Sequence, residues 1–295
     1  MLTEFEIGRI VVPTDFSESA QIAVNHGVDL AKRFNAELTL VHVVDAGAYQ
    51  GIFAPSNKTD YKELEAAQQK LQEDAHKLEK EHGISVSQQV VRGRIHEEIV
   101  GISQEIEADL IVMGTHGTSG WEEFFVGSNA FKVVTQASCP VLSIQEQATN
   151  PECRNIILPI DSTPETRQKV RYAVTMAKKF SSTIHIASLL TEDTPEIRFD
   201  FGKKVKQITD YLDREEVPHT EATLVGSNLA TMTMNFAESK QGNLIVMMTE
   251  QEQNLTGFLM GPFAQQIVNH SKIPVLSISP DESLTTTDDS FHALG

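Results

Sequence analysis

The fold is decided by the stretch Asp109-Leu-Ile-Val-Met-Gly114-Thr-His-Gly117, because its strand recurs later as Asn243-Leu-Ile-Val-Met-Met248. Apolar runs of this length are typical of strands that are buried on both faces of a parallel sheet. In the first copy, nine residues separate Gly117 from Gly127-Ser128. In the second copy, Met248 and Gln251 take the places of the two glycines, and Pro262 takes the place of Ser128. One fold therefore occurs twice, and only the first copy keeps a glycine-rich loop.

The repeat extends over most of the 295 residues. Arg9-Ile-Val-Val-Pro-Thr-Asp15 recurs as Asn155-Ile-Ile-Leu-Pro-Ile-Asp161, and the two copies close with Pro140-Val-Leu-Ser-Ile144 and Pro274-Val-Leu-Ser-Ile278. Strand patterns that alternate with helical patterns predict an α/β fold, with a doubly wound parallel sheet in each copy. We expect domains at residues 1–147 and 152–280. The polar tail 281–295 is predicted to be disordered.

Helix signals follow the same repeat. Ser17 is the expected N-cap in the first copy, and Ser162 or Thr163 in the second, where Pro164 would take the first helical position. A long helix should bury the face that carries Leu64 and Leu78 and end near Gly83. Its counterpart, around Val205 to Leu212, should be shorter. His42 and His185 lie inside strand patterns, which favours core positions.

Composition narrows the classes of partner. The net charge is −17, and residues 1–147 hold 11 Lys and Arg against 22 Asp and Glu. Nucleic acids and anionic membranes need a basic face, so neither is expected as a partner. No apolar run approaches the ~20 residues of a membrane helix. The N-terminus lacks a signal-peptide pattern, and we expect a cytoplasmic protein. Cys139 and Cys153 are too few for a disulfide framework, and Cys139 is expected to be a packed thiol.

Residues suited to ligand binding fall where ligands bind in doubly wound sheets, outside the carboxyl ends of the strands. Asp15 ends the first strand, Val43 lies near the end of the second, and the loop from Gly114 to Ser128 follows the fourth. Glycines let a backbone approach a phosphate closely, and the helix 129–137 after the loop would offer its N-terminal amides to an anion. We therefore expect an anion site in the first copy; the alternative is that the glycines only shape turns.

This arrangement, Pro-x-Asp followed by Gly-x2-Gly-x9-Gly-Ser in an α/β repeat, resembles the universal stress protein family in its tandem form. The resemblance implies a Rossmann-like, five-stranded parallel sheet in each copy and ATP as the ligand. It implies that adenine lies against Asp15 and Val43. The phosphates and the rest of the nucleotide would then contact Pro13, Thr14, Met113, Gly114, His116, Gly117, Gly127, Ser128 and Asn129. The segment His96-Glu-Glu-Ile99 also resembles a family segment beside the nucleotide.

The second copy departs from this pattern. Pro262 suits a first helical turn but has no N–H to offer a phosphate, and Met248 and Gln251 put side chains where the glycines left room. The expected result is a retained fold with a lost site. In the first copy the loop has no Lys or Arg before Lys132 and carries Glu122 and Glu123, so Mg²⁺ or Mn²⁺ should accompany the nucleotide.

The leading interpretation is a nucleotide-dependent stress sensor or modulator, since no positioned base or arginine finger for hydrolysis stands out. A slow ATPase or nucleotidyl transferase on the same fold is the alternative, and no catalytic residue is assigned. A third interpretation is a scaffold whose second copy binds another ligand through its apolar loop around Met248 and Phe258. The two copies should pair within the chain through their last strands, 141–144 and 275–278, and a homodimer is conceivable. The sequence does not identify the stress, the protein partner or any metal-ligating side chain.

Overall fold

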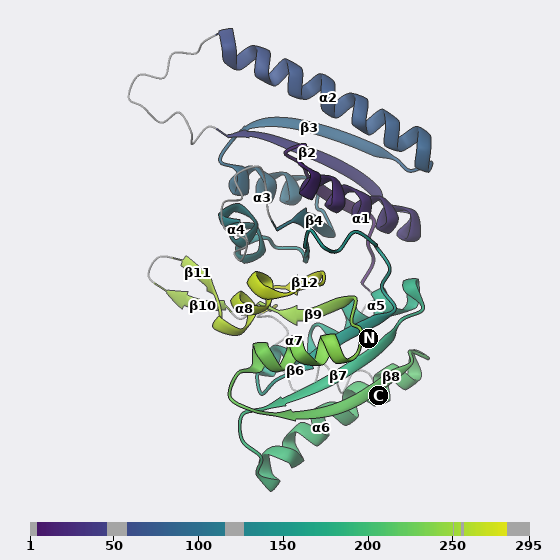
Figure 1. Ribbon diagram of the computed structural model, residues 1–295, viewed down its shortest axis with the longest axis vertical. Coiled ribbons are helices and arrows are strands. Elements are labelled where there is room, and N and C mark those ends of the chain that lie inside the picture. The colour runs from purple at the N-terminus through teal and green to yellow at the C-terminus, as the bar shows by residue number, and fades with distance from the viewer. Residues whose placement is uncertain (1–4, 46–57, 116–126, 250, 255–256, 282–295) are drawn as a thin grey trace. The chain divides into compact units, whose positions relative to one another are not determined.

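The computed structural model describes residues 5–45, 58–115, 127–249, 251–254 and 257–281 (Figure 1). They divide into two compact units. The first unit is Ile7–Pro151, and the second comprises the described residues from Glu152 onward together with Phe5 and Glu6. His116, Gly117, Glu122, Glu123 and the tail 282–295 lie outside the described residues.

The first unit is a five-stranded parallel sheet with four helices. Its strands pair in the order β3-β2-β1-β4-β5, and each pairing is parallel. The strands are β1 (Arg9–Pro13), β2 (Glu37–Asp45), β3 (Val86–Gly93), β4 (Leu110–Gly114) and β5 (Val141–Ile144). The helices are α1 (Glu18–Phe34), α2 (Lys58–His82), α3 (Ile95–Glu105) and α4 (Ser128–Gln136).

The second unit repeats this topology in the order β8-β7-β6-β9-β12, again with parallel pairings. Its main strands are β6 (Asn155–Ile160), β7 (Thr183–Leu190), β8 (His219–Val225), β9 (Leu244–Met248) and β12 (Val275–Ile278). An antiparallel hairpin is added by β10 (Gln251–Asn254) and β11 (Gly257–Met260). The helices are the 3-10 helix η2 (Pro164–Arg167), α5 (Val170–Phe180), α6 (Pro195–Arg214), α7 (Leu229–Ser239) and α8 (Pro262–His270). Two repeated, doubly wound domains with five parallel strands each are thus confirmed.

The central strands form the core of each unit. Ile10, Val11 and Val12 of β1 have no exposed surface, nor do Ile156 and Ile157 of β6. A strand with neighbours on both edges and helices on both faces must be apolar at every position, which explains the continuous hydrophobic runs in the sequence.

The predicted helix ends are right in the first unit. The Ser17 hydroxyl accepts the Ala20 N–H at 3.1 Å as the N-cap of α1, and α2 ends one residue before Gly83, which has a left-handed φ of 67°. In the second unit, Thr163 precedes a 3-10 helix, and the α-helix begins only at Val170. The α2 counterpart, α6, is shorter than α2, as expected, but longer than the stretch predicted for it.

In the first unit, one side chain joins the amino ends of the central strands β1 and β4. One carboxylate oxygen of Asp109, the residue before β4, accepts the N–H groups of Gly8 and Arg9 at 2.8 and 2.9 Å. These two N–H groups stand at the start of β1, so the carboxylate joins the amino ends of β1 and β4.

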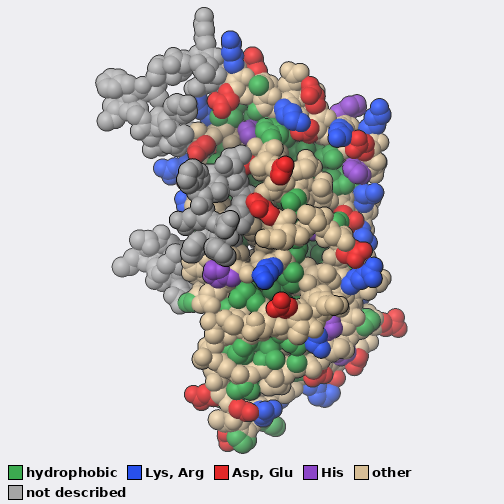
Figure 2. All heavy atoms as spheres, in the orientation of Figure 1, with side chains coloured by type: hydrophobic (Ala, Val, Ile, Leu, Met, Phe, Trp, Pro, Cys, Tyr) green, Lys and Arg blue, Asp and Glu red, His purple; other side chains and the backbone are tan. Residues whose placement is uncertain are grey.

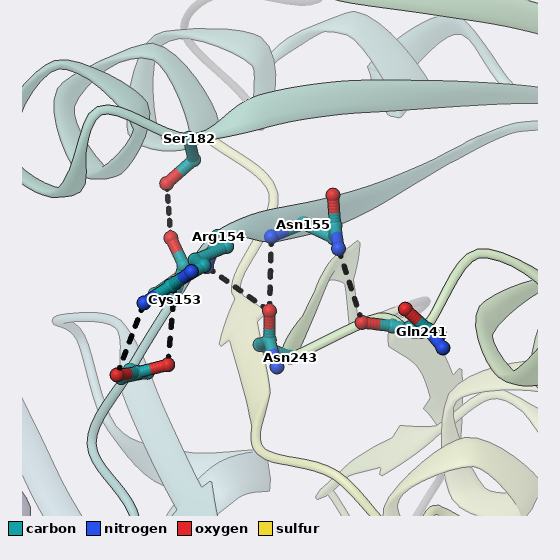
Figure 3. Close-up of polar contacts among 7 residues, drawn as sticks. Cys153, Arg154, Asn155, Ser182, Gln241 and Asn243 are labelled. Carbon is teal, nitrogen blue, oxygen red and sulfur yellow. Dashed lines mark hydrogen bonds and ion pairs between the residues drawn. The ribbon is translucent and has the colours of Figure 1, made fainter.

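The second unit repeats the contact with an amide. Figure 3 shows the Asn243 Oδ1 atom accepting the N–H groups of Arg154 and Asn155, each at 3.0 Å. The Asn155 side chain in turn donates to the Gln241 carbonyl at 3.3 Å. We call the two contacts the Asp109 clamp and the Asn243 clamp.

No helix in the described part of the chain is both long and apolar enough to cross a membrane. On the face drawn in Figure 2, acidic and basic side chains are interspersed, and the described residues on it form no continuous basic field.

Candidate functional site

The strand order places a topological switch point in the first unit between β1 and β4. From β1 the chain proceeds outward to β2 and β3, and it then returns to the other side of β1 with β4 and β5. The loops that follow β1 and β4 therefore diverge at their carboxyl ends, which is where doubly wound sheets bind ligands. Asp15 follows β1, and Gly114 ends β4.

Asp15 organises the turn into α1. Its Oδ1 atom accepts the Ser17 N–H at 3.0 Å and the Ser17 hydroxyl at 2.5 Å, while Ser17 caps the helix. Asp15 is only partly buried. The carboxylate is thus held in one orientation at the edge of the sheet by its own turn, and it has a structural role besides the predicted binding role.

The residues around Asp15 form a small aromatic pair. Phe16 adopts a left-handed φ of 63° and stacks on His42 with ring centroids 4.5 Å apart. His42 Nδ1 lies 2.8 Å from the Thr14 carbonyl oxygen, so this nitrogen carries the hydrogen and donates it. His42 is half-buried at the carboxyl end of β2. The expectation of a core histidine is wrong here, because at position 42 the strand has already reached the edge of the sheet.

Gly114 is required by packing. A Cβ atom on Gly114 would lie 2.9 Å from the Ser19 hydroxyl and 3.2 Å from the Ser19 carbonyl oxygen. The absent side chain therefore lets the first turn of α1 pack against the end of β4. Met248 supplies that side chain in the second unit, where a 3-10 helix replaces the first α-helical turn.

The two ends of the glycine-rich loop are tied together. The Gly127 N–H donates to the Thr115 carbonyl at 2.7 Å, and the Thr115 N–H donates to the Ile144 carbonyl at 3.0 Å. Gly127 is the N-cap of α4, and the first intrahelical bond runs from Phe131 to Gly127. The amides of Ser128, Asn129 and Ala130 precede that bond and are the groups that a helix N-terminus offers to an anion.

The remaining predicted residues lie at or behind this edge. Pro13 ends β1 and Thr14 follows it, while Val43 is half-buried in the last part of β2. Met113 is 6% exposed in β4, so its side chain belongs to the core. The structure thus brings together the carboxyl ends of β1, β2 and β4 with the start of α4.

The segment that begins with His96, which the family resemblance implied to lie beside the nucleotide, forms the first turn of α3. His96, in the first turn of α3, has neighbours on α4, Asn129 and Lys132, that act on its pKa. Burial and the charge of Lys132 lower the pKa of His96, while Glu97 and the Asn129 hydrogen bond act in the opposite direction. The second copy lacks this histidine, because Ala230 stands at the matching position.

In the second unit the corresponding edge is closed by its own side chains. Asp161 makes the same turn as Asp15, with its Oδ1 atom 2.9 Å from the Thr163 N and 2.5 Å from the Thr163 hydroxyl. Lys204 reaches from α6 to the carbonyls of Ser162 and Thr163 at 2.8 and 3.4 Å, and burial lowers its pKa. Arg167 donates to Gln207, also on α6.

The first unit leaves the matching space open. A cavity of about 190 Å³ lies between α1 and α2, and Phe16, Gln21, Leu40 and Leu71 are among its lining residues. Gln21 stands at the position that Arg167 occupies 146 residues later. In the second unit, α6 is therefore hydrogen-bonded to the turn that follows β6. In the first unit, a cavity lies beside α2 and the turn that follows β1.

The second-unit counterpart of the glycine-rich loop also differs. It folds into the β10–β11 hairpin, in which Gln251 pairs with Met260 and Asn254 with Gly257. Gly261 is the N-cap of α8, and Pro262 is the first residue of the helix. Backbone groups of this loop pair with each other, and the helix start has one N–H fewer than in the first unit.

Two further observations concern thiol and metal chemistry in the described residues. Burial raises the pKa of Cys139 to about 11, so its thiol stays protonated near neutral pH, as expected of a packed thiol. Among the described residues, no three His, Cys, Asp or Glu side chains gather as a metal site would require.

The fold defines a class, the doubly wound α/β proteins, whose ligands generally bind at a switch point at the carboxyl ends of the strands. A model of the universal stress protein family matches residues 6–145 and 152–279, so the chain belongs to this family, with one family domain in each unit.

Relatives and solved structures agree with this assignment. Universal stress protein MJ0531 of Methanocaldococcus jannaschii is 36% identical over 140 residues, which cover 47% of this chain and 82% of the relative. Universal stress protein MJ0577 of the same organism is 33% identical over 156 residues, covering 47% and 95%. The crystal structure of a universal stress protein from Archaeoglobus fulgidus DSM 4304 covers 92% of this chain and 98% of its own, with a TM-score of 0.76. Its sequence identity is 20%, so it shows the fold alone.

Proposed function

We propose that the first unit binds an adenine nucleotide, ATP together with Mg²⁺ or Mn²⁺, and that the protein is a nucleotide-dependent sensor or modulator in the cytoplasm. One observation carries the proposal: the hydrogen bond from Gly127 to Thr115, 2.7 Å long, which holds the start of α4 beside the end of β4. Two glycines far apart in the loop motif, Gly114 and Gly127, thereby lie beside one helix N-terminus, and the N-terminal end of a helix favours an anion. Membership of the family supports an adenine nucleotide as the anion.

In this proposal each group has a defined task. Asp15 and Val43, at the carboxyl ends of β1 and β2, would hold the adenine, and the first-turn amides of α4 would hold the phosphates. The N-terminal end of a helix favours negative charge, so these residues fit a polyphosphate. The divalent cation would be ligated mostly by phosphate oxygens and water.

The second unit is proposed not to bind nucleotide. Lys204 caps the carbonyls of the turn after β6, and Pro262 removes an amide from the start of α8. Its fold is intact, so its role would be to contact other proteins or the first unit.

The test replaces Ser128, the first residue of α4, with the proline that occupies the first position of α8. Ser128→Pro removes the hydroxyl and the backbone N–H at the first position of α4. Gly127 has φ −53° and ψ 142°, a conformation compatible with a following proline and close to the −63° and 159° of Gly261 before Pro262. The variant should therefore fold. Titration calorimetry with ATP and Mg²⁺ should give one site per chain in the wild type and a loss of about tenfold or more in Ser128→Pro.

Two control variants complete this experiment. Ser128→Ala removes only the hydroxyl and should weaken binding less than proline does, and Pro262→Ser should leave both stoichiometry and affinity unchanged. Two equivalent sites in the wild type, or full affinity in Ser128→Pro, would contradict the proposal.

A further inference from the structure

A cavity of about 210 Å³ lies in the second unit, between α6 and the strands β7 and β8. Leu190 of β7 and Phe201 and Val205 of α6 are among its apolar lining residues, and each of the three is at most 8% exposed. Pockets for drug-sized molecules measure about 300–1,000 Å³ and combine apolar walls with a few polar groups. This cavity therefore has room for a smaller molecule.

One polar group in the cavity wall has no partner. Ser188 of β7 lines the cavity and is 5% exposed, yet its hydroxyl has no hydrogen-bond partner among the residues that the structure describes. Buried polar side chains normally have such a partner, because an unpaired one costs free energy. A molecule inside the cavity would supply it.

Gly202 keeps the mouth of the cavity open. This residue lies in the interior of α6 and is exposed, although glycine is a poor helix former. A Cβ atom at Gly202 would meet no heavy atom within 4 Å, so packing does not require the glycine. Gly202 also lines the cavity, and its missing side chain leaves the entrance clear.

The first unit has larger side chains at both positions. His42 stands 146 residues before Ser188, at the same place in the sheet, and its ring is hydrogen-bonded to the Thr14 carbonyl. The buried faces of α2 and α6 match at an offset of 134, which gives Gly202 the position of Gln68. The two small residues at the cavity are therefore features of the second unit alone.

The cavity is not a remnant of a nucleotide site. Leu189 is the counterpart of Val43, which the proposed function places against the adenine. Successive side chains of a strand point to opposite faces of the sheet, so Leu189 and Ser188 face opposite sides. The cavity therefore lies on the other face of the sheet from the position that corresponds to the adenine contact.

The charged groups around the cavity favour a positively charged ligand. Glu221 of β8 lines the cavity on the same face as Ser188, since the register pairs Ser188 with Thr223, two residues farther on. Glu221 forms no ion pair within the described part of the chain. Arg198 lines the cavity too, but it already donates to both carboxylate oxygens of Asp193. Glu221 is therefore the charge at the cavity that remains without an opposite charge.

We propose that this cavity binds a small amine with an apolar body and a second polar end. The ammonium group would lie beside Glu221 at the exposed rim, the body against the Phe201 ring, and the polar end would hydrogen-bond to the Ser188 hydroxyl. Ser188 and Glu221 are two residues out of register on neighbouring strands, roughly 8 Å apart, so a single polar group cannot reach both. The inference does not depend on nucleotide binding by the first unit.

The experiment titrates the full-length protein with tyramine, which has a primary amine, a ring and a phenol hydroxyl, and follows the backbone amides by NMR. The amide signals around Ser188, Gly202 and Thr223 should shift, and those of the first unit should not. Phenethylamine lacks the hydroxyl and para-ethylphenol lacks the amine, so each should bind about 2- to 10-fold more weakly than tyramine.

Variants assign the contacts. Ser188→Ala should weaken tyramine binding and leave phenethylamine binding unchanged, whereas Glu221→Gln should weaken the binding of both amines and leave para-ethylphenol binding unchanged. Gly202→Leu places a side chain at the mouth and should weaken the binding of all three probes. Its control is Gly101→Leu, because Gly101 is exposed in α3 and a Cβ atom there likewise meets no heavy atom within 4 Å. Both leucine variants should keep or raise the melting temperature.

The proposal is wrong if tyramine shifts no amide signal around the cavity, or if it binds Gly202→Leu as tightly as the wild type. Equal affinities for tyramine and para-ethylphenol would also overturn it, because the ammonium group would then contribute nothing. A wild type that binds tyramine but not ATP would contradict the proposed function and leave this inference intact.

Discussion

At the scale of single residues, Asp15 and Asp161 make the same local contact in two units that differ in how far the carboxylate is exposed. Both carboxylates accept an N–H and a hydroxyl from the residue two positions on, so the turn after the first strand is the same in the two units. Asp161 is 7% exposed, whereas Asp15 is only partly buried. The accessible carboxylate is in the unit with the proposed site.

This pair separates the structural role from the binding role. Asp15→Ala and Asp161→Ala should each lower the free energy of unfolding by about 1–2 kcal/mol, because each loses the contacts that order a helix start. Only Asp15→Ala should also weaken ATP binding, by about 5- to 150-fold, the equivalent of one hydrogen bond of about 1–3 kcal/mol. Denaturant unfolding and calorimetry check the two effects. Unchanged affinity in Asp15→Ala would reduce that residue to a capping role.

At the scale of elements, the Asp109 and Asn243 clamps join strands that are distant in the sequence. In each unit one oxygen atom accepts two consecutive N–H groups at the start of the first strand, from the residue just before the fourth strand. The contact sets the register of two neighbouring parallel strands at their amino ends. It lies at the opposite end of the sheet from the proposed binding edge.

We expect the two clamps to be interchangeable. Asn243→Ala leaves two N–H groups without their acceptor and should lower the free energy of unfolding by about 1–3 kcal/mol. Asn243→Asp should cost little, because a carboxylate makes the same two contacts in the first unit. Denaturant unfolding of both variants checks this, and neither should change ATP binding. Equal losses from alanine and aspartate would mean that the Asn243 amide nitrogen, and not its oxygen, carries the stabilisation.

For the whole molecule, three buried histidines link stability to pH. His26 Nε2 lies 2.7 Å from the Ala148 carbonyl, so this nitrogen carries the hydrogen and donates it. His185 donates from Nε2 to the Asn155 carbonyl oxygen Oδ1 at 3.0 Å and accepts the Thr220 hydroxyl at Nδ1, 2.7 Å away. Burial is the largest effect on these rings and lowers the pKa of His26, His96 and His185 below 6.5, although Asp29 near His26 and Glu97 near His96 act in the opposite direction.

The sign of the pH dependence follows from this shift. Near and below pH 6.5 the unfolded chain binds more protons on these histidines than the folded chain does, so stability rises with pH. The stability that these neutral histidines contribute is complete above the pKa that they have in the unfolded chain. It is lost as the pH falls through that pKa toward the lower pKa values of the folded protein. Denaturant unfolding should therefore give a smaller free energy at about pH 5.5 than at about pH 7.5.

The matched variants are His26→Gln and His76→Gln. Glutamine at position 26 can still donate to a carbonyl but cannot titrate, so the loss of stability on acidification should be smaller than in the wild type. His76 is exposed on α2, and its replacement should leave the acid loss unchanged. A wild-type-like acid loss in His26→Gln would show that other groups, such as carboxylates, dominate the pH dependence.

By itself, the sequence determined the repeat, the parallel sheets, the Ser17 cap, the end of α2 before Gly83 and the family. Each of these depends on a pattern within one short stretch, such as an apolar run, a capping residue or a glycine spacing, whose physical cause is local. The same patterns identified the edge residues Asp15 and Val43 and the loop glycines as candidates for binding.

Only the tertiary structure decided which side chains from distant stretches meet. It placed His42 at the carboxyl end of the sheet and not in the core, and it placed Lys204 over the turn of the second unit. It also showed that α5 starts late, after a 3-10 helix, in the unit where Met248 stands in place of Gly114. These contacts join elements tens of residues apart, and they depend on how helices pack on the sheet, on burial and on the space that each neighbour leaves.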